Sequence, residues 1–250
     1  MKCVKKENAM PKFSQVYSEF RKNIGPDLGK LENNRIGRNE FVANELILDN
    51  LSILNIGGGG KRHLQTALKR CGKSNASVFE IDITGDCDLV LNLDKVNRID
   101  FEDGKFDVVC AFDVLEHLEQ FHLINEEIFR LSRKECLISL PISSTEFFPS
   151  LFGISRKPDG NRNETGVYSK FYGLPKNHPD DRHRWFLYFD DIVEFYLNFA
   201  EVKNCKVTFY TPLIQKSIGK VSKALIIGIF GKRFFYNFVQ KAIFIKLSKT

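Results

Sequence analysis

The sequence predicts an α/β protein with a seven-stranded, Rossmann-like and mostly parallel sheet that has helices on both faces. Three observations lead to this prediction. Short, almost wholly apolar segments alternate with helical patterns from residue 51 to about 230, as in parallel sheets that are covered on both sides. Glycine or aspartate directly follows several of these segments, at the strand ends where such sheets bind ligands. The 250-residue chain is also long enough to bury a core without disulfides or a structural metal.

A helical N-terminal extension is predicted for residues 1–50. Phe13, Val16, Tyr17 and Phe20 recur at helical spacing, so we expect an amphipathic helix whose apolar side packs on the domain. A lid over a bound ligand is the alternative interpretation of this helix.

The main domain is predicted over residues 51–230. Apolar runs predict strands at 52–56, 77–81, 89–93, 106–112, 136–140, 207–210 and 224–230. Helical spacing predicts helices at 61–70, from about 115, at 124–131 and at 190–199. The turn-rich stretch at about 147–186 is predicted as an insertion, because a long irregular loop in a compact domain is usually functional or mobile.

Residues 231–250 are predicted to form a basic and aromatic C-terminal helix. From Val202 to Thr250 there are ten Lys and Arg but no Asp or Glu, whereas the rest of the chain has 27 basic and 31 acidic residues. Such a helix can lie on an anionic membrane surface. Docking of the helix on the core, or a solvated basic edge, is the alternative.

Composition excludes several classes of protein. The six cysteines have neither CxxC nor zinc-site spacing, which favours reduced thiols in the cytoplasm. The N-terminus lacks the apolar stretch of a signal peptide, and no run of about 18 apolar residues predicts a membrane span. We therefore expect a cytoplasmic protein that contacts at most the inner face of a membrane.

Four glycines, Gly57–Gly60, follow the first predicted strand. Their backbone can approach a ligand closely, and the helix that follows presents free N–H groups to it. The spacing excludes a P-loop, since Asn55 stands where its first glycine is needed, and Arg62 stands where a dinucleotide fingerprint needs its third glycine. A ligand that has an adenosine and a positive charge but no phosphate suits the loop better. Asp82, at the tip of the second strand, can accept hydrogen bonds from both ribose hydroxyls, and Asp94 can accept one from the adenine amino group.

Four segments in order carry a resemblance to a known family: ILNIGGGG, FEIDI, LNLD and FEDGKFDVVCAFDVLEHL. Together they resemble the class I S-adenosylmethionine-dependent methyltransferases over about residues 50–142. The branch with quinone-pathway and surface-polysaccharide-cluster enzymes is the most similar. Two positions depart from the family pattern: Asn55 replaces an acidic residue, and Lys61 replaces the third glycine of the loop.

The resemblance implies S-adenosylmethionine as the cofactor. Gly57 and Gly59 would line its methionine part, Asp82 would hold the ribose, Asp94 or the backbone N–H of Leu93 would meet the adenine, and Asp113 would face the sulfonium. The full set of implied cofactor-binding residues is Asn55, Gly57, Gly58, Gly59, Asp82, Ile83, Leu93, Asp94 and Asp113.

The methyl acceptor is predicted to be a hydroxyl of a saccharide or of a lipid-linked saccharide. A small aromatic or quinone-like acceptor is the alternative within the enzyme class. RNA is not expected, because the basic segment has no evident nucleic-acid motif. A non-catalytic module that binds the cofactor and presents a partner surface is the alternative from another class.

His183, Asp113 and His117 are the candidate catalytic residues. His183 suits a general base at neutral pH. A structural network that holds the insertion is the alternative for this residue. Asp113, Glu116 and His117 have the i, i+3, i+4 spacing of one helical face and resemble the D/E-x-x-E-H element of some O-methyltransferases that hold a metal. We expect packing without a metal there, because three residues are a small ligand set for a hard cation. Arg182 and Arg184 are predicted to bind a phosphate or carboxylate.

Overall fold

The computed structural model describes residues 13–26, 30–31, 35–45, 48, 50–145, 147, 182–214 and 220–250. The main sheet consists of β2 (Ser52–Ile56), β3 (Ser77–Asp82), β4 (Leu89–Val90), β5 (Phe106–Phe112), β6 (Ser132–Pro141), β7 (Cys205–Tyr210) and β9 (Ala242–Lys249). The helices are α1 (Phe13–Lys22), α2 (Arg35–Glu45), α3 (His63–Arg70), α4 (Phe121–Leu131), α7 (Phe189–Lys203) and α8 (Lys220–Phe238), with the 3-10 turns η1 (Leu93–Lys95) and η2 (Leu115–His117). A two-stranded parallel sheet joins β1 (Lys30–Leu31) to β8 (Leu213–Ile214).

The sheet is seven-stranded and mostly parallel, as predicted. Its strand order is β4-β3-β2-β5-β6-β9-β7, and β9 is antiparallel to both of its neighbours. The order reverses beside β2, because β3 pairs on one side of it and β5 on the other. The carboxyl ends of β2, β3 and β5 therefore meet at the point where a sheet of this kind binds its ligands.

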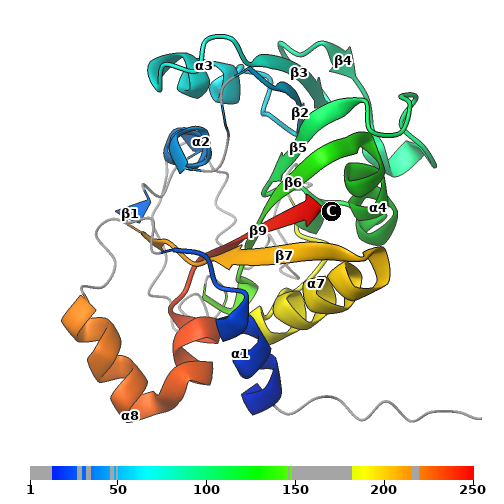
Figure 1. Ribbon diagram of the computed structural model, residues 1–250. Helices are drawn as coiled ribbons and strands as arrows, with labels where there is room; N and C mark the ends of the chain where they lie inside the picture. Colours follow the sequence, from blue (N-terminus) through cyan, green and yellow to red (C-terminus); the bar gives the residue numbers. More distant parts are fainter. Residues whose placement is uncertain are drawn as a thin grey trace, which may run out of the picture.

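Two apolar cores cover the two faces of the sheet. Leu54 and Ile56 of β2 point into a core shared with α1, α4 and α7, whereas Ile53 points into a second core shared with α2 and α3. This alternation is the two-residue period of a strand, and it places α2 and α3 on the side opposite α4 and α7 (Figure 1).

The N-terminal helices are present, and α1 packs as predicted. Its Val16 and Phe20 are buried in the core that also holds α7. Packing rather than a lid is thus the role of this helix. The helix that reaches the glycine loop is α2, which packs against α3 (Figure 1).

The sequence predicted a strand followed by a helix for residues 224–250, and this order was wrong. Residues 224–230 lie in α8 and not in a strand, and the predicted C-terminal helix at 231–250 contains the end of α8 followed by β9. A short apolar run does not by itself distinguish a strand from a helix. The seventh strand is β9, which is inserted between β6 and β7 and has apolar residues on both faces.

The predicted insertion at about 147–186 lies mostly outside the described residues, which resume at Arg182. In the part of the chain that the structure describes, no helix is both long and apolar enough to cross a membrane.

Candidate active site

The glycine loop turns the chain sharply at the end of β2. Gly57 has φ 70°, and its N–H donates to the carbonyl oxygen of Ile81 on β3 at 2.8 Å. A Cβ at Gly57 would overlap the side chain of Val114. Only glycine combines this positive φ with so close an approach, so the loop is fixed against the neighbouring strand.

Asp82 lies directly at this bend. Its Oδ2 accepts a hydrogen bond from the N–H of Gly59 at 2.6 Å, and its Oδ1 accepts one from the N–H of Ile83 at 2.7 Å. The sequence predicted that the loop and this carboxylate lie together, and the structure confirms that they do. That Asp82 also holds a ribose stays a prediction.

Three residues are predicted to lie near the adenine: Ile83, Leu93 and Asp94. Ile83 is 62% exposed beside Asp82, whereas Leu93 is buried. Asp94 Oδ1 accepts hydrogen bonds from the N–H groups of Glu119 and Gln120, so its carboxylate holds η1 to the start of α4. Contact of Asp94 with an adenine stays a prediction.

Asp113 follows β5 in a left-handed conformation, with φ 53°. Its Oδ1 accepts a hydrogen bond from Ser139 Oγ at 2.7 Å, and its Oδ2 forms an ion pair with Arg38. The predicted helical face shared with Glu116 and His117 was wrong, because η2 is a 3-10 turn that begins only at Leu115. Asp113 therefore faces the glycine loop side and α2.

A small cavity lies between α2 and the glycine loop. Arg38 and Asn39 were missed by sequence reasoning, because a polar helix in the extension gives no signal that it will fold over the loop. The cavity is lined by Arg38, Asn39, Asn55, Gly57, Gly58 and Phe112. Three of the predicted cofactor residues are thus gathered around one space, next to the guanidinium of Arg38, which is paired with Asp113.

A second cluster forms at η2, where the structure joins the candidate catalytic histidines. One ligand atom from each of Glu116, His117 and His183 lies within 4.8 Å of the other two. The rings of His117 and His183 meet edge to face, with 4.6 Å between their centroids. Glu116 and His183 are buried, 1% and 5% exposed.

Backbone contacts bring His183 to this place from far along the chain. The N–H of Arg184 donates to the carbonyl oxygen of Glu116 at 2.7 Å. The indole N–H of Trp185 donates to the carbonyl oxygen of Leu118, also at 2.7 Å. The segment after residue 181 is therefore held along η2, with His183 turned to Glu116 and His117.

The donor set of this cluster is two imidazoles and one carboxylate. This combination suits a divalent transition-metal ion rather than a hard cation such as Mg²⁺. The expectation that no metal binds rested on the small size of a three-residue ligand set for a hard cation. The structure also gives three residues, with His183 in the place expected for Asp113. These three residues could hold such an ion, or one of them could act as a base with the other two orienting it.

Comparisons with known proteins concern the domain and the fold. A protein-family model described as a methyltransferase domain matches residues 54–140, and no curated protein matches the chain. Among solved structures, one chain of the complex between the Haloferax volcanii Trm112 methyltransferase activator and a putative methyltransferase is 11% identical, with a TM-score of 0.50 over 95% of each chain. A SAM-dependent methyltransferase from Archaeoglobus fulgidus is 16% identical, with a TM-score of 0.46 over 96% of this chain and 100% of that one.

The small RNA methyltransferase HEN1 is 13% identical, with a TM-score of 0.49 over 86% of this chain. This chain spans only 25% of the length of HEN1. At 11% identity, the match with a TM-score of 0.50 shows the fold alone. The family match shows that residues 54–140 carry a methyltransferase domain, and such a domain implies S-adenosylmethionine as the cofactor.

Proposed function

We propose that this S-adenosylmethionine-dependent methyltransferase domain transfers a methyl group to a hydroxyl oxygen of a saccharide or a lipid-linked saccharide. The observation that carries the proposal is the convergence of Glu116, His117 and His183 at the edge of the sheet that also holds the glycine loop. A hydroxyl needs a group that removes its proton before it can attack a methyl group. This cluster supplies such a group.

Bound S-adenosylmethionine supplies an electrophilic methyl group on its sulfonium. The glycine loop and Asp82 hold the cofactor, and Asp113 lies between the loop and η2. At the cluster, His183 takes the proton of the acceptor hydroxyl, with Glu116 as its orienting partner. A divalent ion held by the same three residues would lower the pKa of that hydroxyl.

The acceptor side is formed by the last residues of the predicted insertion, from Arg182 on. Arg184 is half exposed and pairs with Glu119, Nη1 to Oε1 at 3.2 Å, so its guanidinium is at the surface beside the cluster. Arg182 and Arg184 bind a phosphate or carboxylate of the acceptor. A saccharide joined to a lipid through phosphate has such a group next to its hydroxyls.

Substitution of His183 by alanine tests the proposal. We expect kcat for methyl transfer to saccharide hydroxyls to fall about 10²-fold or more, while the affinity for S-adenosylmethionine is unchanged. His122→Ala is the matched control, because His122 contacts Trp185 by its ring but lies outside the cluster. Binding of S-adenosylmethionine without turnover of any hydroxyl acceptor would instead favour the non-catalytic module.

Metal content separates the two roles of the cluster. Purified protein is dialysed against Mn²⁺, Zn²⁺ or Co²⁺ and analysed by atomic emission. A stoichiometric ion that is lost in Glu116→Gln supports the metal site. A metal-free protein with full activity shows that His183 acts as a base.

The partner of the basic segment is proposed to be an anionic membrane, reached through α8. Its exposed apolar residues are Leu225, Ile229, Phe230 and Phe234, and no residue from 202 to 250 is acidic. In Figure 1, α8 extends away from the sheet. Exposed apolar side chains in a segment whose own charged residues are all basic match an anionic lipid surface. Of these basic residues, Arg233 pairs with Asp190 of α7. A symmetric dimer in which α8 meets α8 would bring like charges together.

Flotation with liposomes tests this contact. Wild-type protein is expected to float with liposomes that contain phosphatidylserine and less so with neutral ones, and Ile229→Ser with Phe230→Ser removes the binding. Val202→Ser is the control, because Val202 is also exposed, at 71%, but lies on α7. Unchanged flotation of the double variant, or dimers by light scattering that it abolishes, would contradict the proposal.

A further inference from the structure

A cavity of about 500 Å³ lies at the amino end of the parallel strands, away from the glycine loop. It is bounded by the ends of α4, α7 and β9 and by the start of β6. Its charged lining residues are Arg130, Arg133, Lys203, Lys249, Asp103 and Glu126. Cavities of this volume bind small molecules, and four basic side chains against two acidic ones favour an anion.

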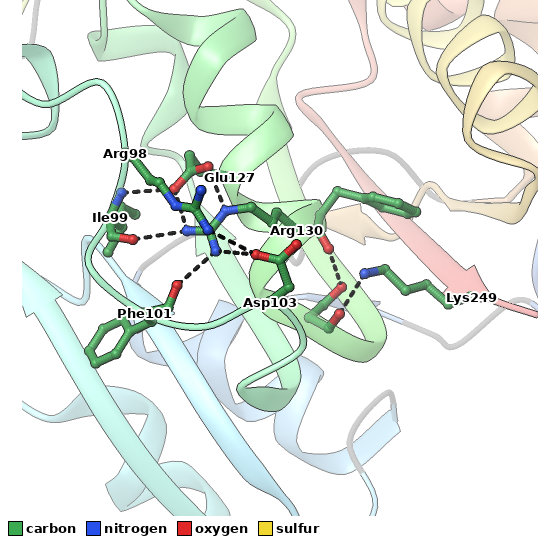
Figure 2. A network of polar contacts seen from close by, with 9 residues as sticks. Arg98, Ile99, Phe101, Asp103, Glu127, Arg130 and Lys249 are labelled. Carbon is green, nitrogen blue, oxygen red and sulfur yellow. Dashed lines mark hydrogen bonds and ion pairs between the residues drawn. The ribbon is translucent and has the colours of Figure 1, made fainter.

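Lys249 is a half-buried cation of this cavity that forms no ion pair with a carboxylate among the described residues. Its Nζ donates a hydrogen bond to the carbonyl oxygen of Ser132 at 2.6 Å, which Figure 2 shows. The same Nζ lies 4.3 Å from the centre of the Phe129 ring. Ser132 is the C-cap residue of α4, so the hydrogen bond explains where the ammonium lies. The charge is nevertheless left without a counterion, which is costly for a group that is partly removed from water.

Lys203 brings a second ammonium group to the same ring. Its Nζ lies 6.0 Å from the centre of the Phe129 ring and pairs with Glu126 Oε2 at 2.5 Å. The Glu126 side chain is 50% exposed, so water screens this pair. Burial is the largest cause that lowers the pKa of Lys249, and the charge of Lys203 acts in the same direction. The two ammonium groups therefore repel each other, and an anion between them removes this cost.

The two arginines of the cavity are engaged with carboxylates of the chain. Arg130 Nη1 donates to Asp103 Oδ1 at 2.7 Å, so the nearby charge of Asp103 is already balanced. Arg133 uses Nε and Nη2 for Asp107, and its Nη1 has no hydrogen bond among the described residues. The cavity therefore has donors from two lysines and one arginine, on α7, β9 and β6, for an anion with several acceptor oxygens.

We propose that this cavity binds a small organic phosphate monoester, with its phosphate between Lys249 and Lys203 and its organic part against the ring of Phe129. Phosphate oxygens accept charge-assisted hydrogen bonds from ammonium and guanidinium groups. The aromatic ring supplies an apolar wall, as in most small-molecule sites. This inference is independent of the proposed function, because none of these residues belongs to the glycine loop or to the histidine cluster.

The place of the cavity in the fold indicates the source of the phosphate. In Figure 1, the end of β9 lies beside α4, whereas α8 lies at the opposite side of the molecule. A membrane that α8 contacts is therefore remote from Lys249. We infer that the phosphate belongs to a soluble molecule and not to a lipid headgroup.

Calorimetric titration with inorganic phosphate and with phenyl phosphate tests the proposal. We expect phenyl phosphate to bind about 10-fold more tightly than inorganic phosphate, because its ring buries apolar surface on Phe129. Lys249→Met is expected to weaken the binding of both about 30-fold, as for lost charge-assisted hydrogen bonds. Lys246→Met is the matched control, because Lys246 is also a half-buried lysine of β9 but pairs with Glu135. Equal affinity of the wild type and Lys249→Met would overturn the proposal, as would the absence of saturable binding up to about 10 mM.

A second variant and a melting experiment guard against a folding defect. Lys203→Met is expected to weaken phenyl phosphate binding about 10-fold. Phenyl phosphate should raise the melting temperature of the wild type and of Lys246→Met, but not that of Lys249→Met. Melting curves without ligand show whether each variant is folded. Wild-type affinity in a folded Lys203→Met would contradict the position of the phosphate between the two lysines.

Two further arms distinguish this cavity from other phosphate sites. Arg184→Met changes the proposed acceptor side and is expected to bind phenyl phosphate as the wild type does. Binding that is lost in Arg184→Met but kept in Lys249→Met would place the phosphate at the acceptor side and overturn this inference alone. Lys249→Met is expected to float with phosphatidylserine liposomes as the wild type does. A loss of flotation would assign the cavity to a lipid headgroup and overturn the inference.

Discussion

Buried acidic residues at the two ends of the parallel strands differ in their hydrogen-bond partners. At the amino end, Asp107 Oδ2 accepts hydrogen bonds from the N–H and the hydroxyl of Ser52, both at 3.0 Å, and Oδ1 pairs with Arg133 at 2.6 Å. At the carboxyl end, Glu80 has no hydrogen-bond donor among the described residues. One acid is satisfied by hydrogen bonds from its own chain, whereas the other has none among the described residues.

The amino end contains a second saturated network, shown in Figure 2. Arg130 donates to the carboxylates of Glu127 and Asp103 and to the carbonyl oxygens of Ile99 and Phe101. These bonds hold the loop before β5 to the end of α4. Polar groups at the amino end stabilise the fold. We therefore expect substitutions of acidic residues at the amino end to change stability and those at the carboxyl end to change cofactor binding.

The pKa values follow the same division. Burial acts to raise the pKa of Asp107, but Arg133, Ser52 and Lys134 together hold it well below its ordinary value. For Glu80, burial prevails and raises the pKa to about 7. Four substitutions test whether the two ends differ as described.

The largest effect is expected from Asp82→Ala at the carboxyl end. We expect affinity for S-adenosylmethionine to fall about 10³-fold, because the change removes charge-assisted hydrogen bonds to the ribose and the bond that shapes the loop at Gly59. Calorimetric titration measures it. Undiminished affinity would refute the placement of the cofactor on this loop.

Asp107→Asn at the amino end should act on stability instead. We expect the free energy of unfolding to fall by about 3 kcal/mol at pH 7, because a buried and paired charge is removed, and ligand affinity to stay the same. Since the folded-state pKa of Asp107 is lowered, the wild type has this stabilisation at neutral pH and loses it as the pH falls below the ordinary Asp value. Urea unfolding at several pH values measures both effects. A loss of cofactor affinity without destabilisation would remove the distinction.

Glu80→Gln should change stability with the opposite sign. The pKa of Glu80 in the folded protein, about 7, is above its ordinary value of 4.5, so the folded state holds the proton more tightly and wild-type stability falls as pH rises between these values. At pH 8 the free energy of unfolding of the variant is therefore expected to be about 2 kcal/mol higher than that of the wild type. At pH 4.5 the two should be alike. Urea midpoints that differ by the same amount at both pH values would contradict this account.

Asp103→Asn gives the smallest effect. Asp103 belongs to the Arg130 network but is 71% exposed, and exposed ion pairs contribute little because water and salt screen them. We expect no measurable change in the urea midpoint or in cofactor affinity. A clear destabilisation would show that the network depends on its exposed member.

Local sequence patterns were sufficient to predict the carboxyl end of the sheet. The apolar runs of β2 and β5 were predicted at their observed bounds, and the glycine loop and Asp82 are adjacent because parallel strands end at one edge. The order of α8 and β9 was not predictable, since both contain short apolar runs and only pairing with β6 and β7 identifies β9 as the strand.

Contacts between segments that are distant in the sequence could not be predicted either. His183 meets His117 through backbone bonds across more than sixty residues, and no local spacing encodes such a contact. The absence of hydrogen-bond donors around Glu80 among the described residues likewise depends on the three-dimensional arrangement of the chain. The sequence marked Asn55 as a departure from the family pattern, but only the register of β2 and β3 places Glu80 opposite to it.

The position of β9 has a consequence for biosynthesis. β9 follows β7 and α8 in the chain, but in the sheet it separates β6 from β7. While the ribosome still holds residues 242–249, β7 has no partner strand and β6 lacks one of its two neighbours. Until β9 emerges, the nascent chain therefore has two unpaired strand edges, on β6 and β7. Such edges are sites of misassembly and chaperone binding.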